Sequence, residues 1–357
     1  MARRPGLKTI ALDHLEGVLR RERAEQQDVY APLSRMRLEV RSPLAPIGER
    51  YQIALAGEKS RSPALLTPTS LSQVCQIAGV PSVFLDRAPA ALGLKSLRAM
   101  LDIASESADK QFLFRMKNGK TSTLRAVLPQ SYVRFDDVDV LAELRAAAGG
   151  EELRAAVTTI DPDTLFVRVV RGTQIELGTQ MHSDPALAGI DIITSETGRR
   201  PLEVRQVLFR VACANGLTWV SDHQKKLKTR YTRMDRPTFQ HVLRATLDSC
   251  FHHAGTMAAR LASTRRIHAK DPVEEIERIF ERYRLGSAKG RIGRWVIGEV
   301  AKHVTLFGVQ RFDIVQAFTA VARGLMPDDR LKIEDAMGAY MLHGAEGRAG
   351  RPEETMN

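Results

Sequence analysis

Lysine and arginine side chains crowded into residues 223–236 are the groups in this sequence that most clearly indicate a chemistry. Six cations fall within twelve residues, with one tyrosine among them and one tryptophan just upstream. Cationic side chains neutralise phosphates, and aromatic rings stack on unpaired bases. We therefore interpret the segment as a nucleic-acid surface whose candidate residues are Trp219, Lys225, Lys226, Lys228, Arg230, Tyr231 and Arg233. A solvated linker is the alternative.

Other cations could extend this surface. Arg199 and Arg200 are the nearest pair upstream and are included among the candidate contacts, and a formal net charge of +11 should attract polyanions. An arginine-rich composition inherited from a GC-rich genome is the alternative explanation. Further basic groups that could join the surface are Arg265, Arg266, Lys289, Arg291 and Arg294.

No catalytic signature accompanies the cations. Several carboxylates fall in or beside irregular segments and could collect a divalent metal, which leaves open an enzyme acting on nucleic acid: Asp161, Asp163, Asp184, Asp191 and Glu196. Their spacing matches no established metal motif, and phosphate-binding glycine patterns are absent. The sequence therefore predicts neither a metal site nor a cofactor.

Two Asn-Gly pairs between apolar segments predict β-hairpins. Residues 202–211 alternate as a strand, Asn215 and Gly216 are expected to form a type I′ turn, and residues 217–220 to form the return strand. The second hairpin is expected over residues 111–117 and 121–128, with Asn118 and Gly119 at its turn. An antiparallel sheet should therefore be the central element.

The remaining elements are assigned from periodicity and capping residues. Strands are expected at 36–40, 51–55, 153–160 and 165–170, followed by a long irregular connection over 172–201. Helices are expected at 10–27, from Thr69 or Ser70 to 77, from Pro81, at 93–104, at 136–147, and throughout the chain beyond Pro237. Asp136 or Asp137 should cap the helix at 136–147, Gly149-Gly150 should end it, and Asp271 should cap a helix of the C-terminal region.

These elements predict an α+β fold: a largely antiparallel sheet built from hairpins, flanked by helices, with an all-helical C-terminal region. The expected parts are a basic N-terminal arm over 1–35, an α+β core over 36–236, a helical region over 237–343 and a disordered tail over 344–357.

Three segments resemble the family called domain of unknown function 932, which is common in phage and plasmid proteins. They are Leu124–Leu128 leading to Tyr132, Ser195–Gly198, and Phe209–Gly216, and the helical segment 71–85 also fits. The similarity covers about residues 40–260, but residues 129–131 and the Arg199–Arg200 pair depart from the usual pattern. The resemblance implies mobile elements and their DNA as the context, and it carries no catalytic residues.

The motif residues also have a physical interpretation. Asn215 and Gly216 serve the turn, and Gly198 relieves backbone strain. Charged residues beside strands need partners, so we expect Glu196 to form an ion pair with Arg210 or with Arg125.

The sequence as a whole predicts a protein that binds nucleic acid, with single-stranded or recombining DNA favoured, in an annealing or accessory role. The alternatives are the metal-dependent enzyme and a protein-binding modulator of host or phage systems. Three isolated cysteines, no apolar run long enough to span a membrane and no signal peptide indicate the cytoplasm. A homo-oligomer is possible.

Overall fold

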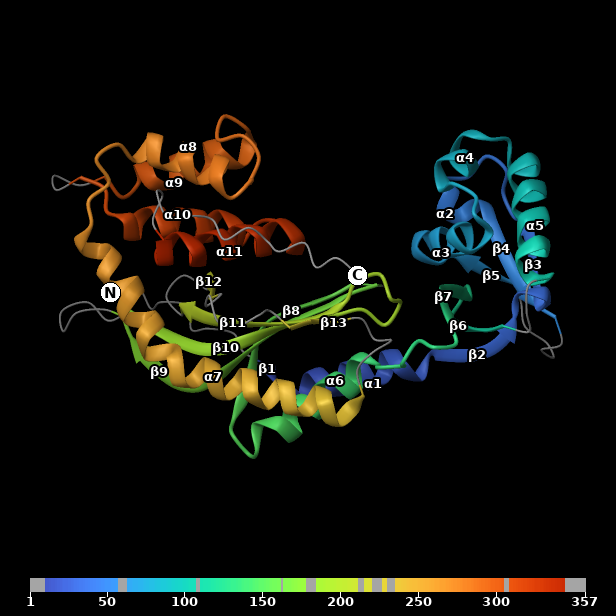
Figure 1. Ribbon diagram of the computed structural model, residues 1–357, viewed down its shortest axis with the longest axis horizontal. Helices are drawn as coiled ribbons and strands as arrows, with labels where there is room; N and C mark the ends of the chain where they lie inside the picture. The colour runs from blue at the N-terminus through green and yellow to red at the C-terminus, as the bar shows by residue number, and fades with distance from the viewer. Residues whose placement is uncertain are drawn as a thin grey trace.

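The computed structural model describes residues 10–56, 63–106, 110–161, 163–177, 184–210, 215–219, 227–229, 235–304 and 308–343. These residues form two β-sheets, helices that cover them, and a helical C-terminal region (Figure 1). The α+β class expected from the sequence is therefore confirmed.

The larger sheet is antiparallel at every strand pair. In the described part of the chain its order is β1-β8-β9-β10-β11-β12, and β13 pairs with β11 beside β12. The strands are β1 (Ile10–Ala11), β8 (Leu153–Ile160), β9 (Leu165–Glu176), β10 (Pro185–Thr194), β11 (Leu202–Arg210), β12 (Asn215–Trp219) and β13 (Leu227–Thr229).

The prediction of an irregular connection over residues 172–201 is wrong. β9 continues to Glu176, and β10 lies between β9 and β11 near the centre of the sheet. Helices cover both faces of the sheet here, so β10 is buried along almost its whole length and shows no alternation of apolar and polar residues. The alternation used to find the other strands could not detect it.

The hairpin of β11 and β12 is confirmed, but its turn lies elsewhere. Asn215 pairs with Arg210 and Gly216 pairs with Phe209, so both residues belong to β12 and not to a two-residue turn. The connection is the four residues 211–214, which lie outside the described part of the chain.

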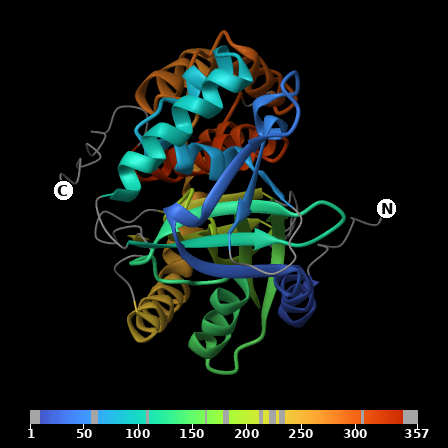
Figure 2. The same ribbon diagram turned by 90° about the vertical axis from the view of Figure 1, so that its right-hand side faces the viewer.

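The smaller sheet has the strand order β2-β6-β7-β5-β4-β3 among the described residues, with β5 and β7 parallel. The predicted strands at 36–40 and 51–55 are confirmed, and they pair with each other as β3 and β4. The predicted hairpin of β6 and β7 is also confirmed, although five residues connect its strands in place of the tight Asn118-Gly119 turn. Its strands are β2 (Gln26–Pro32), β3 (Met36–Val40), β4 (Tyr51–Leu55), β5 (Ala64–Leu66), β6 (Gln111–Lys117) and β7 (Thr123–Pro129). Figure 2 turns this blue and teal sheet towards the viewer, in front of the larger sheet.

Capping residues set the limits of the N-terminal helices. Thr67, not Thr69 or Ser70, caps α3, because its side chain accepts from the Ser70 amide. Asp136 caps α6, one of the two candidates from the sequence, and forms a capping box with Asp139. Gly149 ends this helix in the left-handed conformation, as the sequence predicts. The helices are α1 (Leu12–Ala24), α2 (Ile47–Arg50), α3 (Pro68–Ala78), α4 (Ser82–Arg87), α5 (Ala90–Glu106) and α6 (Asp137–Ala148).

The C-terminal helices cover both faces of the larger sheet. α7 runs along one face, and α10 and α11 lie over the other (Figure 1). Asp271 caps α8 as the sequence predicts, by accepting from the amides of Val273 and Glu274. The helices are α7 (Arg236–Ser263), α8 (Pro272–Arg282), α9 (Arg291–Ala301), α10 (Arg311–Ala322) and α11 (Pro327–His343).

A buried ion cluster attaches α11 to the larger sheet. Arg168 of β9 lies directly opposite Asp191 of β10, and two of its nitrogens each lie 2.6 Å from an Asp191 carboxylate oxygen. Its Nη2 also lies 2.6 Å from Oε2 of Glu334 in α11. Burial opposes ionisation of Glu334, but Arg168 and Arg330 outweigh it and hold the pKa of this carboxyl below its ordinary value.

We expect the Glu334→Gln substitution to lower the free energy of unfolding by about 3 to 5 kcal/mol, because one partner of a buried ion cluster is lost. Urea unfolding followed by circular dichroism measures this change. Asp329→Asn is the matched control on the same helix: Asp329 and Lys332 are exposed, 3.7 Å apart, and should contribute less than about 1 kcal/mol. Equal effects of the two substitutions would show that the cluster does not hold α11.

Candidate functional site

Most of the predicted cationic contact segment lies outside the described residues. This holds for Lys225, Lys226, Arg230, Tyr231 and Arg233. Of the others, Trp219 lies in β12 opposite Gln206, and Lys228 lies in β13 opposite Glu203. β12 and β13 therefore pair with the same edge of β11, one after the other, and the cationic segment belongs to the chain that joins and follows them.

Arg199 and Arg200 lie between β10 and β11, at the same end of β11 as β13. The backbone of Thr229 pairs with Leu202, two residues after Arg200. The Arg199 side chain is 63% exposed and its Nη1 lies 3.3 Å from Oδ2 of Asp163. Arg200 forms an ion pair with the exposed carboxylate of Asp328. These two arginines are therefore at the surface, each with one carboxylate beside it.

A cavity of about 570 Å³ opens beside the two arginines, between α3, the hairpin of β6 and β7, and the segment 198–201. We call it the cleft. Apolar and aromatic side chains make up much of its wall, with glutamine amides and the arginines at the remaining positions. The lining residues are Gln73, Gln76, Ile77, Phe112, Val127, Leu128, Pro129, Tyr132, Gly198, Arg199, Arg200 and Pro201.

Gly198 brings its backbone against the wall of the cleft. Its φ is +70°, and a Cβ atom there would lie 2.8 Å from Cδ2 of Leu128 and 3.4 Å from Cε2 of Tyr132. The expectation that a glycine relieves strain after Glu196 is confirmed. The turn between β10 and β11 thus requires glycine both for its conformation and for its close approach.

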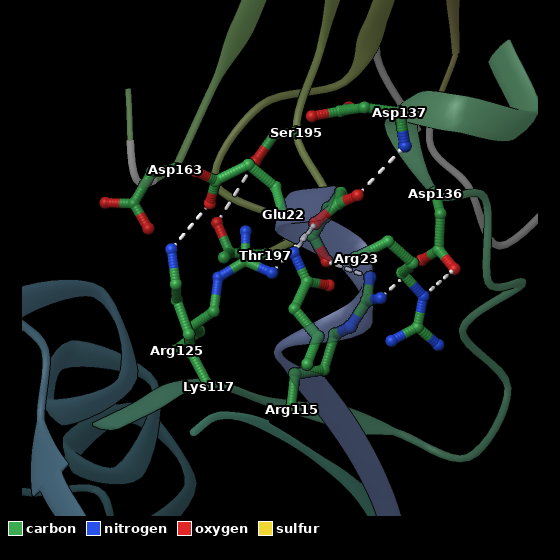
Figure 3. Close-up of polar contacts among 12 residues, drawn as sticks. Glu22, Arg23, Arg115, Lys117, Arg125, Asp136, Asp137, Asp163, Ser195 and Thr197 are labelled. Atoms are coloured by element: carbon green, nitrogen blue, oxygen red, sulfur yellow. Dashed lines mark hydrogen bonds and ion pairs between the residues drawn. The ribbon is translucent and has the colours of Figure 1, made fainter. Parts of the chain in front are cut away.

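A buried polar network lies behind this turn (Figure 3). We call the ion pairs and hydrogen bonds around Glu196, Arg115 and Arg125 the motif network. Glu196 accepts from Nη1 of Arg125 at 2.8 Å, from the Asp137 amide at 2.9 Å and from Gln26 at 3.2 Å. The predicted Glu196–Arg125 pair is therefore confirmed.

The alternative pair with Arg210 does not form. Nε of Arg210 instead donates to Asp184 of the same sheet, and Arg265 contacts the same carboxylate. Arg210 therefore belongs to a different ion cluster, on the side of the larger sheet that faces α10.

Arg115 of β6 is the fully buried cation of the motif network, and it is not among the residues predicted from the sequence. It donates to Oδ1 of Asp28 at 3.1 Å, to the Glu196 carbonyl oxygen at 2.8 Å, and to Asp136. Burial opposes its charge, but the carboxylates of Asp136 and Asp28 outweigh it and raise the pKa of Arg115 above its ordinary value. Apolar residues on both faces of strand 111–117 were the available signal that this arginine is internal.

Hydrogen bonds tie α3 to the same turn. Gln73 donates to the Thr197 carbonyl at 2.7 Å and accepts from the Val127 amide at 2.8 Å. Tyr132 donates to the Ser195 carbonyl at 3.2 Å. The segments 71–85, 124–132 and 195–198, which are far apart in the sequence, therefore meet at one point and fix the turn that carries Arg199 and Arg200.

The carboxylates considered as metal ligands lie apart. Asp161 accepts from two amides of its own turn, and Asp163 accepts from Thr69 at 2.7 Å. Asp184, Asp191 and Glu196 each belong to a separate ion cluster. Across the described ranges, no group of three or more His, Cys, Asp or Glu side chains is placed to hold a metal ion.

Comparisons of the chain with protein-family models, with curated proteins and with solved structures find no match. The resemblance to domain of unknown function 932 therefore stays a prediction, based on the residues that carry it. Within the described part of the chain, no helix is long and apolar enough to cross a membrane. The geometry of the cleft and the charge around it are therefore the observations that bear on function.

Replacement of Gly198 by alanine should destabilise the protein by about 1 to 2 kcal/mol for the left-handed conformation, with a further penalty from the contact with Leu128. Thermal unfolding measures the loss. Gly172→Ala in β9 is the matched control, since its Cβ would meet no atom within 4 Å. A Gly198→Ala protein as stable as the control would contradict the role assigned to this turn.

Asp137 is a partly buried residue whose carboxyl group resists ionisation in the folded protein. Its Oδ1 has no hydrogen-bond partner among the described residues, and burial together with the nearby Glu196 carboxylate raises its pKa well above the ordinary value. The unfolded chain ionises first as pH rises above about 3.9. Asp137 therefore makes folding progressively less favourable as pH rises towards its folded pKa.

Because asparagine mimics the neutral acid at every pH, Asp137→Asn should match the wild type near pH 4 and exceed its stability at pH 8. Urea midpoints at the two pH values check this expectation. Asp102→Asn, at an exposed position of α5, should show no such divergence. A variant that loses stability at pH 8 would mean that Asp137 is ionised in the folded protein.

Proposed function

We propose that this chain binds single-stranded nucleic acid, with DNA favoured, in an annealing or accessory role and without catalysis. The proposal places it with phage- or plasmid-like mobile elements, as the resemblance to domain of unknown function 932 implies. Arg199, Arg200 and the cationic segment around β13 contact phosphates, and the cleft receives an unpaired base.

The net positive charge of the chain carries this proposal, together with the exposed arginine at the rim of the cleft. The formal net charge is +11. The Arg199 side chain, which lines the cleft, is 63% exposed. A basic protein attracts polyanions, and nucleic acid is the most common polyanion that proteins meet.

The cleft supports a single strand over a duplex. Its wall contains Phe112 and Tyr132, and its rim carries Arg199 and Arg200. A base can enter such a cavity only when it is unpaired, with its phosphates left outside to meet the cations. The carboxylates beside the two arginines compete only weakly with a phosphate, because each pair keeps one exposed partner, Arg199 in the first and Asp328 in the second.

The arrangement of the larger sheet is compatible with this role by analogy alone. Antiparallel strands β9 to β12, followed by a long helix across one face, resemble the layout of single-strand annealing proteins. A shared layout does not determine function, so the proposal rests on the positive charge and on the cleft.

The experiment is a salt titration of a fluorescently labelled single-stranded oligonucleotide. The doubly substituted protein Arg199→Gln/Arg200→Gln should bind more weakly at low salt. Its plot of log affinity against log salt should be shallower by about 1.4, since each phosphate contact on a single strand contributes about 0.7 to the slope.

Arg154→Gln is the matched control. Like Arg199, this arginine is more than half exposed and paired with a carboxylate, but it lies at the opposite end of β8 from the turn that contains Asp163. A control with the wild-type slope supports the assignment to the cleft. Absence of binding by the wild type would refute the proposal, and shortening of the oligonucleotide with Mg²⁺ or Mn²⁺ would favour a nuclease in its place.

A further inference from the structure

A second cationic surface lies in the helical region, on the exposed face of α9. Its side chains follow a helical spacing of three or four residues, so they project from the same side of the helix. They are Arg291, Arg294, Trp295, Gly298 and Lys302, all exposed, while Val296 and Val300 face the core of the helical region.

Trp295 is the central residue of this face. Its large apolar ring is 47% exposed, although burial of an indole is among the most favourable contacts available to a side chain. The guanidinium carbon of Arg291 lies 5.0 Å from the centre of the ring. An exposed indole beside cations is the combination that binds a planar base attached to a phosphate.

A groove of about 700 Å³ runs beside Trp295, between α9 and the end of α10. Its lining includes the small residues Gly298, Ala320 and Gly324, together with Val321. Cationic side chains also line the groove: Arg294, Lys302 and Arg323. The described residues of its lining include one carboxylate, Glu299, and this group is ion-paired with Lys302.

We propose that this groove is a second contact site for single-stranded nucleic acid. A base stacks on Trp295 beside the small residues of the groove lining, and the neighbouring phosphates contact Arg294, Lys302 and Arg323. The inference rests on the proposed function, because it assigns to the same ligand a site that is separate from the cleft.

The shape and charge of the groove favour nucleic acid over an acidic peptide. A carboxylate-rich peptide would satisfy the cations but would make no use of an exposed indole, whereas every base offers a flat ring for stacking. Space is also available, since a Cβ at Gly298 would meet no atom within 4 Å. The ligand therefore has room to lie along the helix.

The two sites are far enough apart to need a long ligand. α9 lies at the upper left of Figure 1, whereas α3, which lines the cleft, lies at the right. A strand that reaches both sites binds the second one intramolecularly, so it should bind more tightly than a short strand that reaches one.

Tryptophan fluorescence gives a direct test. The chain has two tryptophans, so Trp219→Phe leaves Trp295 as the only indole. Oligothymidylate should quench this fluorescence on binding, and polyglutamate should not. Quenching by polyglutamate but not by oligothymidylate would overturn the proposal and assign the groove to an acidic protein partner.

A pair of substitutions at Gly298 tests the groove without altering its cations. Both Gly298→Glu and Gly298→Gln add a side chain of similar size where no neighbour is in the way, and both favour the helix over glycine. The glutamate variant should bind a long oligothymidylate roughly tenfold more weakly than the glutamine variant, because its carboxylate repels the phosphates of the strand and competes with them for a cation of the groove.

The outcomes separate the two proposals. Equal affinities of the Gly298 variants and an unchanged Trp295 signal, together with weaker binding by Arg199→Gln/Arg200→Gln, would overturn the groove and leave the cleft as the binding site. Absence of oligothymidylate binding by the unsubstituted protein would overturn both.

Discussion

The buried carboxylate of Glu196 is the interaction on which the arrangement of the two sheets depends. It follows β10 of the larger sheet and binds β7 through Arg125, β2 through Gln26 and the start of α6 through an amide. A buried charge without partners is costly by several kcal/mol, so these elements are held together wherever Glu196 stays internal. The turn that follows Glu196 then has a fixed position against the wall of the cleft.

Buried arginines explain why several carboxylates of this protein lie inside. Arg115 and Arg168 are fully buried, and each is surrounded by two carboxylates from other elements. The cluster around Arg115 joins β6 to β2 and to the start of α6. The cluster around Arg168 joins β9 to β10 and to α11.

The sequence predicted those parts of the fold that local signals determine. Alternating strands, a cap at Asp136 or Asp137 and the cap at Asp271 were found because neighbouring residues specify them. β10 was missed, since a strand covered on both faces loses its alternation. Arg115 could not be connected with Glu196, 81 residues away, because only the three-dimensional arrangement brings them together.

The long helix α7 has a consequence for how the molecule unfolds. Its 28 residues extend about 42 Å. Its first half packs Phe239, Leu243 and Leu247 beneath the larger sheet, and its last turns pack Met257 and Leu261 among the C-terminal helices. A single continuous helix thus belongs to two hydrophobic cores. Neither core can unfold while the other keeps its full set of contacts, so the two should lose structure in a single cooperative step.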